Sequence, residues 1–394
     1  MSSDDTHFDV PRTKPSISIT TKPLRTWFGG IVKIGGYSLF ATIFSCFLAV
    51  SLCVAGELRL TQTATIELPV NARTLAWHPN SKTLAAGGWS GMLTVWDTQT
   101  GKLIRDLRQP NNATLGEIQY SADGKFLAVG KLRAGSKQAY LSILDASSFQ
   151  VIDKLESPKM LEGERGNVSL ESLSIDPITS KRIVLSGYTN GRDPVIFTSG
   201  NSPQKLIQLS PDARYLAVKV SFSPTGRIIA VGRQNGVIDL YSAENGQLVK
   251  SFSVFDDIWW IRALNFSPDG RYIFVASNTG AGREWLDRTT GKWTIHKNNE
   301  PIKMWDVQTQ SLIRTFDTQG RGIESLEITT DNRYLIAGLT KGFVAIWDVK
   351  TGAEIKRFRP SANSTIVKLS PDGKQFATSD TGSKKVKIWM INEQ

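Results

Sequence analysis

The sequence has few of the residues from which catalytic and metal sites are most often built. Its 394 residues include two cysteines and three histidines. Both cysteines, Cys46 and Cys53, lie in one apolar stretch near the N-terminus, and the rest of the chain has none. Beyond that stretch this excludes a disulfide framework, a thiolate nucleophile and a cysteine-ligated zinc site.

Catalytic motifs are missing as well. Outside the N-terminal tail the histidines are His78 and His296, too few for a His-rich zinc site, and they give no support to a His-based triad. There is no dinucleotide Gly-loop and no sialidase-type Ser-x-Asp-x-Gly-x-x-Trp motif. Carboxylates are scattered in turn-like stretches, where they commonly form the turn. We therefore expect no catalytic residue, no metal site and no cofactor.

Acidic residues are outnumbered. The chain has 47 Lys and Arg against 36 Asp and Glu, a formal net charge of +11. A basic surface favours acidic partners, anionic lipid or nucleic acid, without choosing among them. Solubility alone is an equally good interpretation of this charge.

One long run has no charged residue at all. Residues 34–55 read IGGYSLFATIFSCFLAVSLCVA, and Trp27 and Phe28 precede them where an interfacial aromatic belt would lie. About 20 apolar residues at ~1.5 Å rise span a bilayer core of ~30 Å. The sequence therefore predicts a disordered polar tail over 1–30, a transmembrane helix over 31–56 and a folded domain over 57–394.

Flanking charge predicts the orientation of this segment. Five Lys or Arg residues precede it, whereas Arg59 alone follows closely. The positive-inside rule then places the tail in the cytoplasm and the folded domain outside it. The alternative is a cleaved signal peptide, with Cys53-Val-Ala55 as the cleavage site, which would release a secreted or periplasmic domain.

The rest of the chain repeats itself. It reads VWDTQTGKLIRDL at 95–107, MWDVQTQSLIRTF at 304–316 and IWDVKTGAEIKRF at 346–358. Trp305, Trp347 and Trp389 are spaced 42 residues apart. A period near 40 residues is typical of repeat architectures.

A second phrase recurs before these. It reads HPNSK at 78–82, SADGK at 121–125, SPTGR at 223–227, SPDGR at 267–271, TTDNR at 329–333 and SPDGK at 370–374. Pro presets φ, Asp bonds its own backbone and Gly takes positive φ, so each phrase predicts a hairpin turn. Short apolar strands follow, then the Trp-Asp strand, another turn and a fourth strand. Each unit is predicted to be a four-stranded antiparallel meander.

One such sheet cannot bury both of its faces, and radial packing of several solves this. The period, the Trp-Asp endings and the SPDGK turns resemble WD40-repeat β-propellers over about residues 58–394. The resemblance implies that Trp96, Trp305, Trp347 and Trp389 pack between neighbouring blades. The family's Gly-His dipeptide is absent from every copy, so its Asp-His-Ser/Thr-Trp network cannot form. We expect the blades to rely on packing instead.

Counting the repeats predicts an all-β, seven-bladed propeller after a single N-terminal transmembrane helix. The blades start near Ala72, Gly116, Leu170, Leu216, Ile261, Gly322 and Thr365. The seventh has three strands before the chain ends. The segment TATIEL at 63–68 is expected to supply its fourth strand, as the family closes its ring. Of two turn-like phrases, at 210–214 and 223–227, the second is taken as the fourth blade's turn.

The fifth blade carries the most distinctive insertion. Its loop over 277–301 and the blade-joining loop over 256–262 are predicted to share one rim, and both contain Trp and Arg. These residue types are enriched at binding hot spots, and long loops are often functional. The alternative is that the tryptophans pack on their own blade. The candidate partner-binding residues are Trp259, Trp260, Arg262, Arg283, Trp285, Arg288, Trp293 and His296.

Together these features predict a non-catalytic, membrane-tethered platform for protein partners. A basic rim with aromatics would also suit single-stranded nucleic acid, but an extracytoplasmic location argues against that. The alternative from another class is an extracytoplasmic hydrolase or lactonase that uses the central funnel. Converging carboxylates around a metal would favour the hydrolase, whereas an apolar or basic funnel would favour the platform.

Overall fold

The structure is a computed structural model. It describes residues 58–108, 113–132, 139–156, 169–188, 194–199, 205–209, 215–255, 260–277, 284–286, 293–295 and 300–392. The predicted tail and transmembrane helix lie outside these residues. Within the described ranges, no helix is long and apolar enough to cross a membrane.

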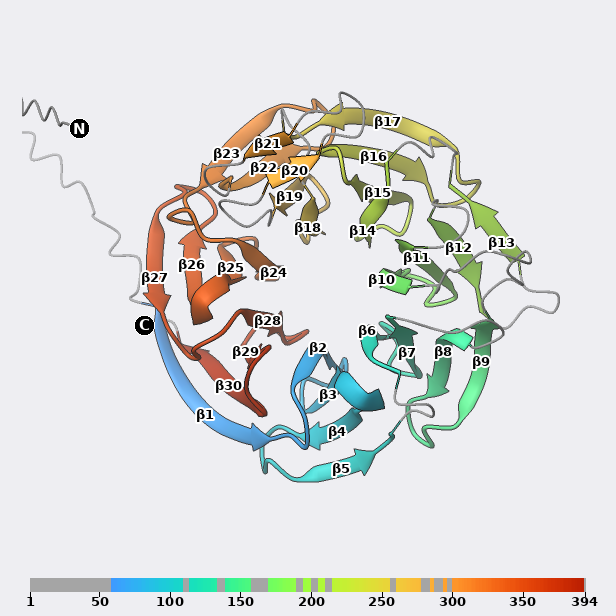
Figure 1. Ribbon diagram of the computed structural model, residues 1–394, viewed down its shortest axis with the longest axis vertical. Coiled ribbons are helices and arrows are strands. Elements are labelled where there is room, and N and C mark those ends of the chain that lie inside the picture. Colours follow the sequence, from blue (N-terminus) through green and yellow to red (C-terminus); the bar gives the residue numbers. More distant parts are fainter. Residues whose placement is uncertain are drawn as a thin grey trace, which may run out of the picture. The chain divides into compact units, whose positions relative to one another are not determined.

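The described strands form seven four-stranded antiparallel sheets arranged as blades (Figure 1). This confirms the predicted all-β, seven-bladed propeller. Blade 1 contains β2 (Ala72–Trp77), β3 (Thr83–Gly88), β4 (Leu93–Asp97) and β5 (Leu103–Asp106). Blade 2 contains β6 (Leu115–Tyr120), β7 (Phe126–Lys131), β8 (Ala139–Asp145) and β9 (Val151–Glu156). Blade 3 contains β10 (Ser169–Ile175), β11 (Arg182–Tyr188), β12 (Val195–Thr198) and β13 (Lys205–Gln208). Blade 4 contains β14 (Ala217–Phe222), β15 (Ile228–Arg233), β16 (Val237–Ser242) and β17 (Leu248–Ser253). Blade 5 contains β18 (Ile261–Phe266), β19 (Tyr272–Ser277), β22 (Ile302–Asp306) and β23 (Leu312–Phe316). Blade 6 contains β24 (Ile323–Ile328), β25 (Tyr334–Leu339), β26 (Val344–Asp348) and β27 (Glu354–Phe358).

Blade 7 joins the two ends of the propeller chain. It contains β28 (Thr365–Leu369), β29 (Gln375–Asp380) and β30 (Lys385–Asn392), completed by β1 (Arg59–Glu67). The N-terminal strand β1 pairs antiparallel with β30, and Ile66 lies opposite Val386. The prediction that an N-terminal strand closes the ring is confirmed, although this strand begins four residues earlier than Thr63.

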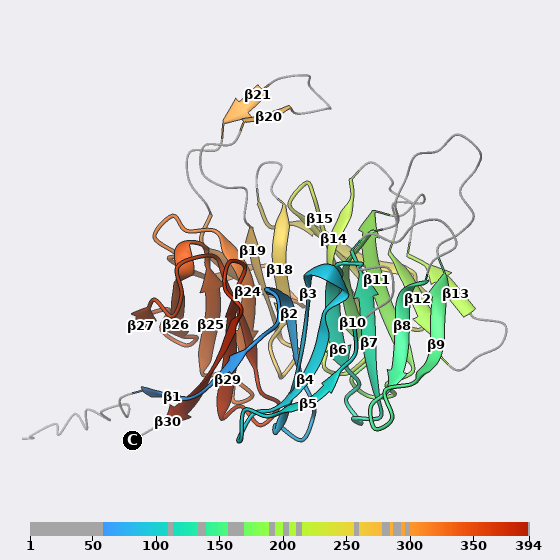
Figure 2. The same cartoon turned by 60° about the horizontal axis from the view of Figure 1, so that its bottom comes forward.

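The blade connections divide between two rims. The turn rim carries the turns between the first and second and between the third and fourth strands. The loop rim carries the other connections, including the blade 5 insert. Within this insert β20 (Glu284–Leu286) and β21 (Trp293–Ile295) form a separate hairpin, seen at the top of Figure 2.

The recurring Ser-Pro-Asp-Gly phrases form tight turns on the turn rim. In blade 5 the Ser267 hydroxyl donates to Asp269 Oδ1 at 2.5 Å and accepts the Tyr272 N–H at 2.9 Å. Gly270 has a φ of +73°, a conformation that glycine adopts without steric cost. In blade 4 the turn between β14 and β15 is the phrase at 223–227, as predicted. The phrase at 210–214 lies outside the described residues.

The aromatic residues of the third strands contact the preceding blade. Trp347 is 1% exposed, and its ring lies 6.2 Å from that of Phe316 on β23. The Trp389 ring lies 4.8 Å from that of Phe358 on β27. The Trp305 ring centroid lies 5.8 Å from that of Phe252 on β17. Trp96 is half-buried and packs against a hydrophobic cluster formed by residues of blades 7 and 1.

Hydrogen bonds also join the blades, so the expectation that they rely on packing alone was wrong. On the inner strands, backbone N–H groups donate to side chains of the preceding blade. These bonds are Ile118 to Thr74 Oγ1 (3.2 Å), Leu173 to Glu117 Oε2 (3.0 Å), Ile175 to Gln119 Oε1 (3.1 Å), Phe222 to Ser174 Oγ (3.0 Å) and Val367 to Ser325 Oγ (2.7 Å). Polar side chains on these strands therefore replace part of the missing family network.

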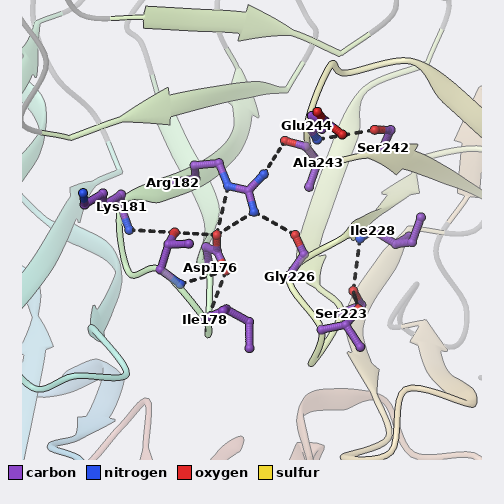
Figure 3. Close-up of polar contacts among 12 residues, drawn as sticks. Asp176, Ile178, Lys181, Arg182, Ser223, Gly226, Ile228, Ser242, Ala243 and Glu244 are labelled. Atoms are coloured by element: carbon purple, nitrogen blue, oxygen red, sulfur yellow. Dashed lines mark hydrogen bonds and ion pairs between the residues drawn. The ribbon is translucent and has the colours of Figure 1, made fainter.

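A side-chain clamp joins blades 3 and 4 on the turn rim (Figure 3). The Arg182 guanidinium donates through Nε to Asp176 Oδ2 at 2.9 Å within blade 3. It also donates to the carbonyl oxygens of Gly226 at 2.9 Å and Ala243 at 2.8 Å in blade 4. The buried Asp176 carboxylate thus orients a cation that binds the next blade.

Blade 4 has no Trp-Asp pair and contains a buried polar network instead. Arg233 and Asp239 form an ion pair and are 4% and 6% exposed. Tyr241 occupies the usual Trp position; its hydroxyl accepts from Arg233 Nη2 at 2.8 Å and donates to Asp239 Oδ2 at 3.2 Å. Ser251 donates to the other carboxylate oxygen at 2.6 Å. Each buried polar group in this network therefore has a partner.

This network makes stability depend on pH in the alkaline range. Burial, together with the Asp239 charge, raises the pKa of Tyr241 to about 12, whereas an unfolded tyrosine titrates near ~10. The phenol therefore stabilises the fold fully below about pH 10, and this contribution is lost as pH rises towards about 12. When the free energy of unfolding is measured in urea at several pH values between about 10 and 12, we expect it to fall less steeply with pH for Tyr241→Phe than for the parent protein. Parallel curves for the two proteins would contradict this.

Candidate functional site

The inner strands of all seven blades surround a central cavity of about 710 Å³. Each inner strand starts at the loop rim and ends at the turn rim. The first residues of these strands therefore surround the loop-rim mouth of the cavity, on the rim that carries the blade 5 insert.

Four charged residues share one structural position at this mouth. In six of the seven blades, the inner strand slips register within its first few residues. β-Bulges of this kind re-aim side chains and are common next to functional sites. In blades 1, 3, 5 and 6 the single residue that the strand pairing skips is charged and lines the cavity: Arg73, Glu171, Arg262 and Glu324. Their charges alternate in sign around the ring, and we call them the mouth ring.

The members of the mouth ring act on one another electrostatically. Burial lowers the pKa of the Arg73 guanidinium. The charge of Arg262 lowers it further, whereas the charges of Glu171 and Glu324 oppose the shift. The Arg73 guanidinium also lies over the ring of Trp89, 5.4 Å from its centroid. Trp89 is 46% exposed in the β3–β4 connection. The mouth thus combines balanced charge with an exposed aromatic ring, which suits contact with a polar peptide.

Deeper in the cavity the carboxylates are paired with cations. Lys368 Nζ lies 2.9 Å from Glu327, which raises the lysine pKa, and Lys219 Nζ lies 3.7 Å from Glu117. Across the described part of the chain, no group of three His, Cys, Asp or Glu residues is placed to hold a metal. An apolar or basic funnel was expected to favour the platform, but this cavity is lined by both basic and acidic residues.

The structure places half of the predicted site residues. Trp259, Arg283, Arg288 and His296 lie outside the described residues. Trp285 on β20 pairs with Thr294, and Trp293 on β21 pairs with Leu286, so the two tryptophans are not cross-strand partners. Trp260 is half-buried just before β18.

Arg262 belongs to the mouth ring, together with three residues that the sequence interpretation missed. The signal was present, because each of the four follows the first apolar residue of its inner strand. These stretches read Ala-Arg-Thr from 72, Leu-Glu-Ser from 170, Ile-Arg-Ala from 261 and Ile-Glu-Ser from 323.

Two family models match parts of the chain. One, described as WD domain, G-beta repeat, matches residues 62–97. The other, described as Anaphase-promoting complex subunit 4 WD40 domain, matches residues 195–261. These matches support the WD40-repeat resemblance. The WD40-like propeller is thus indicated independently by sequence and by fold.

Curated relatives are WD-repeat proteins or larger proteins matched over part of their length. WD repeat-containing protein SL1-17 of Schistosoma mansoni is 25% identical over 193 residues, 49% of this chain and 56% of the relative. Actin-interacting protein 1 of Drosophila melanogaster is 24% identical over 221 residues, 56% of this chain and 32% of the relative. The chain spans about half or less of the length of these relatives.

A solved structure shows the same fold. The β-propeller domain of Cps50 (Swd1) from Myceliophteria thermophila has a TM-score of 0.68 and covers 85% of this chain and 100% of that domain. At 13% identity this likeness bears on the fold alone.

Proposed function

We propose that this chain is a non-catalytic platform that docks protein partners on the loop rim around the mouth ring. The observation that carries the proposal is the mouth ring itself, because four bulges direct charged side chains into one opening beside exposed Trp89. Partner docking agrees with the name of one relative, Actin-interacting protein 1, which describes an interaction of that protein. The blade 5 insert on the same rim would extend the docking surface.

Charge reversal at the mouth tests this proposal. Full-length protein solubilised in detergent is used to capture partners, which are identified by mass spectrometry. We expect Arg73→Glu with Arg262→Glu to weaken capture by about 30-fold, as loss of a hot spot of ~2 kcal/mol would. Lys374→Glu with Arg227→Glu is the matched control, because both residues are exposed on the turn rim. Capture that survives the mouth variant but is lost in the control would overturn the assignment.

The proposal includes a membrane tether. Residues 31–56 would form a single transmembrane helix, with the N-terminus cytoplasmic and the propeller outside the cytoplasm. Support comes from the uncharged run over 34–55 and from the basic residues that precede it.

A reporter fusion tests the topology. A reporter that is active only in the cytoplasm, joined after Gln394, should be silent. A strong signal would reverse the orientation. Mature protein that begins near Gly56 would replace the tether with a cleaved signal.

A further inference from the structure

Two arginines lie over one aromatic ring where blade 6 meets its neighbours on the loop rim, and a lysine lies in the adjoining turn. Arg321 lies between β23 and β24, Lys341 lies between β25 and β26, and Arg359 follows β27. Phe343 follows the short turn that contains Lys341. We call these four residues the basic corner.

Two guanidinium groups share the Phe343 ring. The central carbon of Arg321 lies 4.0 Å from the ring centroid, and that of Arg359 lies 5.6 Å from it. Each contact is attractive, because the face of an aromatic ring carries partial negative charge. The two positive charges nevertheless repel each other across the ring, and a bound anion would relieve that repulsion.

Backbone carbonyls hold one of these cations, Arg359, in place. Arg359 Nε donates to the Lys341 carbonyl at 3.0 Å, and its Nη2 donates to the Ala362 carbonyl at 3.3 Å. Arg321 Nε is buried and has no hydrogen-bond partner among the described residues. Lys341 is exposed on a backbone with a φ of +62°. The corner is therefore pre-organised at Arg359, while the Lys341 side chain is exposed to solvent.

Its charge is not balanced by nearby acids. Among the residues that the structure describes, none of the three cations forms an ion pair, whereas neighbouring Arg357 pairs with Glu354 at 2.6 Å. Two carboxylates of adjoining segments, Asp317 and Asp380, accept backbone N–H groups two residues further on. The mouth ring, in contrast, contains two cations and two carboxylates.

We infer that the basic corner binds an acidic segment of a protein partner, an inference that rests on the proposed docking function. Guanidinium groups match carboxylates in a bidentate geometry, and such charge-assisted bonds are among the stronger ones. A protein segment is favoured over a phosphate backbone because the adjoining mouth ring contains Glu171 and Glu324, which would repel a chain of phosphates. A peptide could place carboxylates against the cations of the basic corner and residues of both charges against the mouth ring, so its charge would complement both surfaces.

The test uses full-length protein in detergent and fluorescein-labelled hexaglutamate as the probe. Binding is followed by fluorescence anisotropy at low and at physiological salt. We expect Arg321→Gln with Arg359→Gln to weaken binding by about tenfold or more, because two charge-assisted contacts are lost. The matched control, Arg227→Gln with Lys374→Gln, removes the same charge from the turn rim and should bind as the parent does. Lys341→Gln is exposed, leaves the packing intact and should weaken binding about threefold.

Three outcomes of the binding assay would overturn the inference. In the first, the corner variants bind like the parent. In the second, the control loses as much binding as the corner variant, which would indicate attraction by net charge alone. In the third, oligothymidylate or inorganic phosphate displaces the probe more readily than unlabelled hexaglutamate does. Partner capture by the mouth variants is measured separately, so that failure of the docking proposal is distinguished from failure at the corner. A captured partner that is retained in full by the corner variant would also overturn the inference.

Discussion

Replacing Asp239 with alanine is expected to lower the free energy of unfolding by about 3–5 kcal/mol. The substitution leaves the Arg233 charge buried, at 4% exposure, without its carboxylate. Tyr241 and Ser251 lose their acceptor in the same step. Denaturation by urea at neutral pH measures the effect, because the midpoint falls in proportion to the lost free energy when the slope is unchanged.

A paired replacement separates the charge from the packing. Arg233→Leu combined with Asp239→Leu removes both charges, and apolar residues often replace a buried ion pair without loss of stability. We therefore expect the double variant to be more stable than Asp239→Ala. If both proteins lose the same free energy, the cost would lie in repacking blade 4, and the ion pair would not be what stabilises it.

The sequence predicted the parts of the fold that are encoded locally. The turn that contains Ser267 and Gly270 forms all its bonds within six residues, so its phrase could be read directly. Trp-Asp endings mark the third strand of a blade and the turn after it, which set the period. Closure by β1 followed from the missing fourth strand of the last blade.

The candidate site could not be predicted in the same way. Arg73 and Glu324 are about 250 residues apart in the sequence and meet only because the ring closes. A charged residue follows the first apolar residue in each of the four strands, but that pattern does not show that a bulge turns these residues towards one opening. The inner-strand bonds were missed for a related reason, because polar residues on a strand read as solvent-facing, whereas here they bind the next blade.

The basic corner and the mouth ring lie on the same rim and differ in charge for a structural reason. The mouth ring is built from inner strands and contains two cations and two carboxylates, whose charges alternate around the cavity. The corner is built from connections, where Lys341 and Arg359 meet through backbone carbonyls instead of acidic side chains. A partner that contacts both surfaces would meet excess positive charge at the edge and balanced charge at the centre.

Replacing Trp347 with alanine should be as damaging as breaking the ion pair, at about 3–5 kcal/mol of unfolding free energy. The side chain is 1% exposed and belongs to a cluster that includes Phe316 and Phe274 of blade 5, so the cavity would open between two blades. Trp347→Phe should lose far less, because it keeps most of the volume and removes a buried Nε1–H that has no partner in the described part of the chain. Trp89→Ala, at a 46% exposed position, should stay within about 0.5 kcal/mol. Urea midpoints for the three variants measure this order directly. Equal losses at Trp347 and Trp89 would show that the packing of this aromatic between blades does not stabilise the ring.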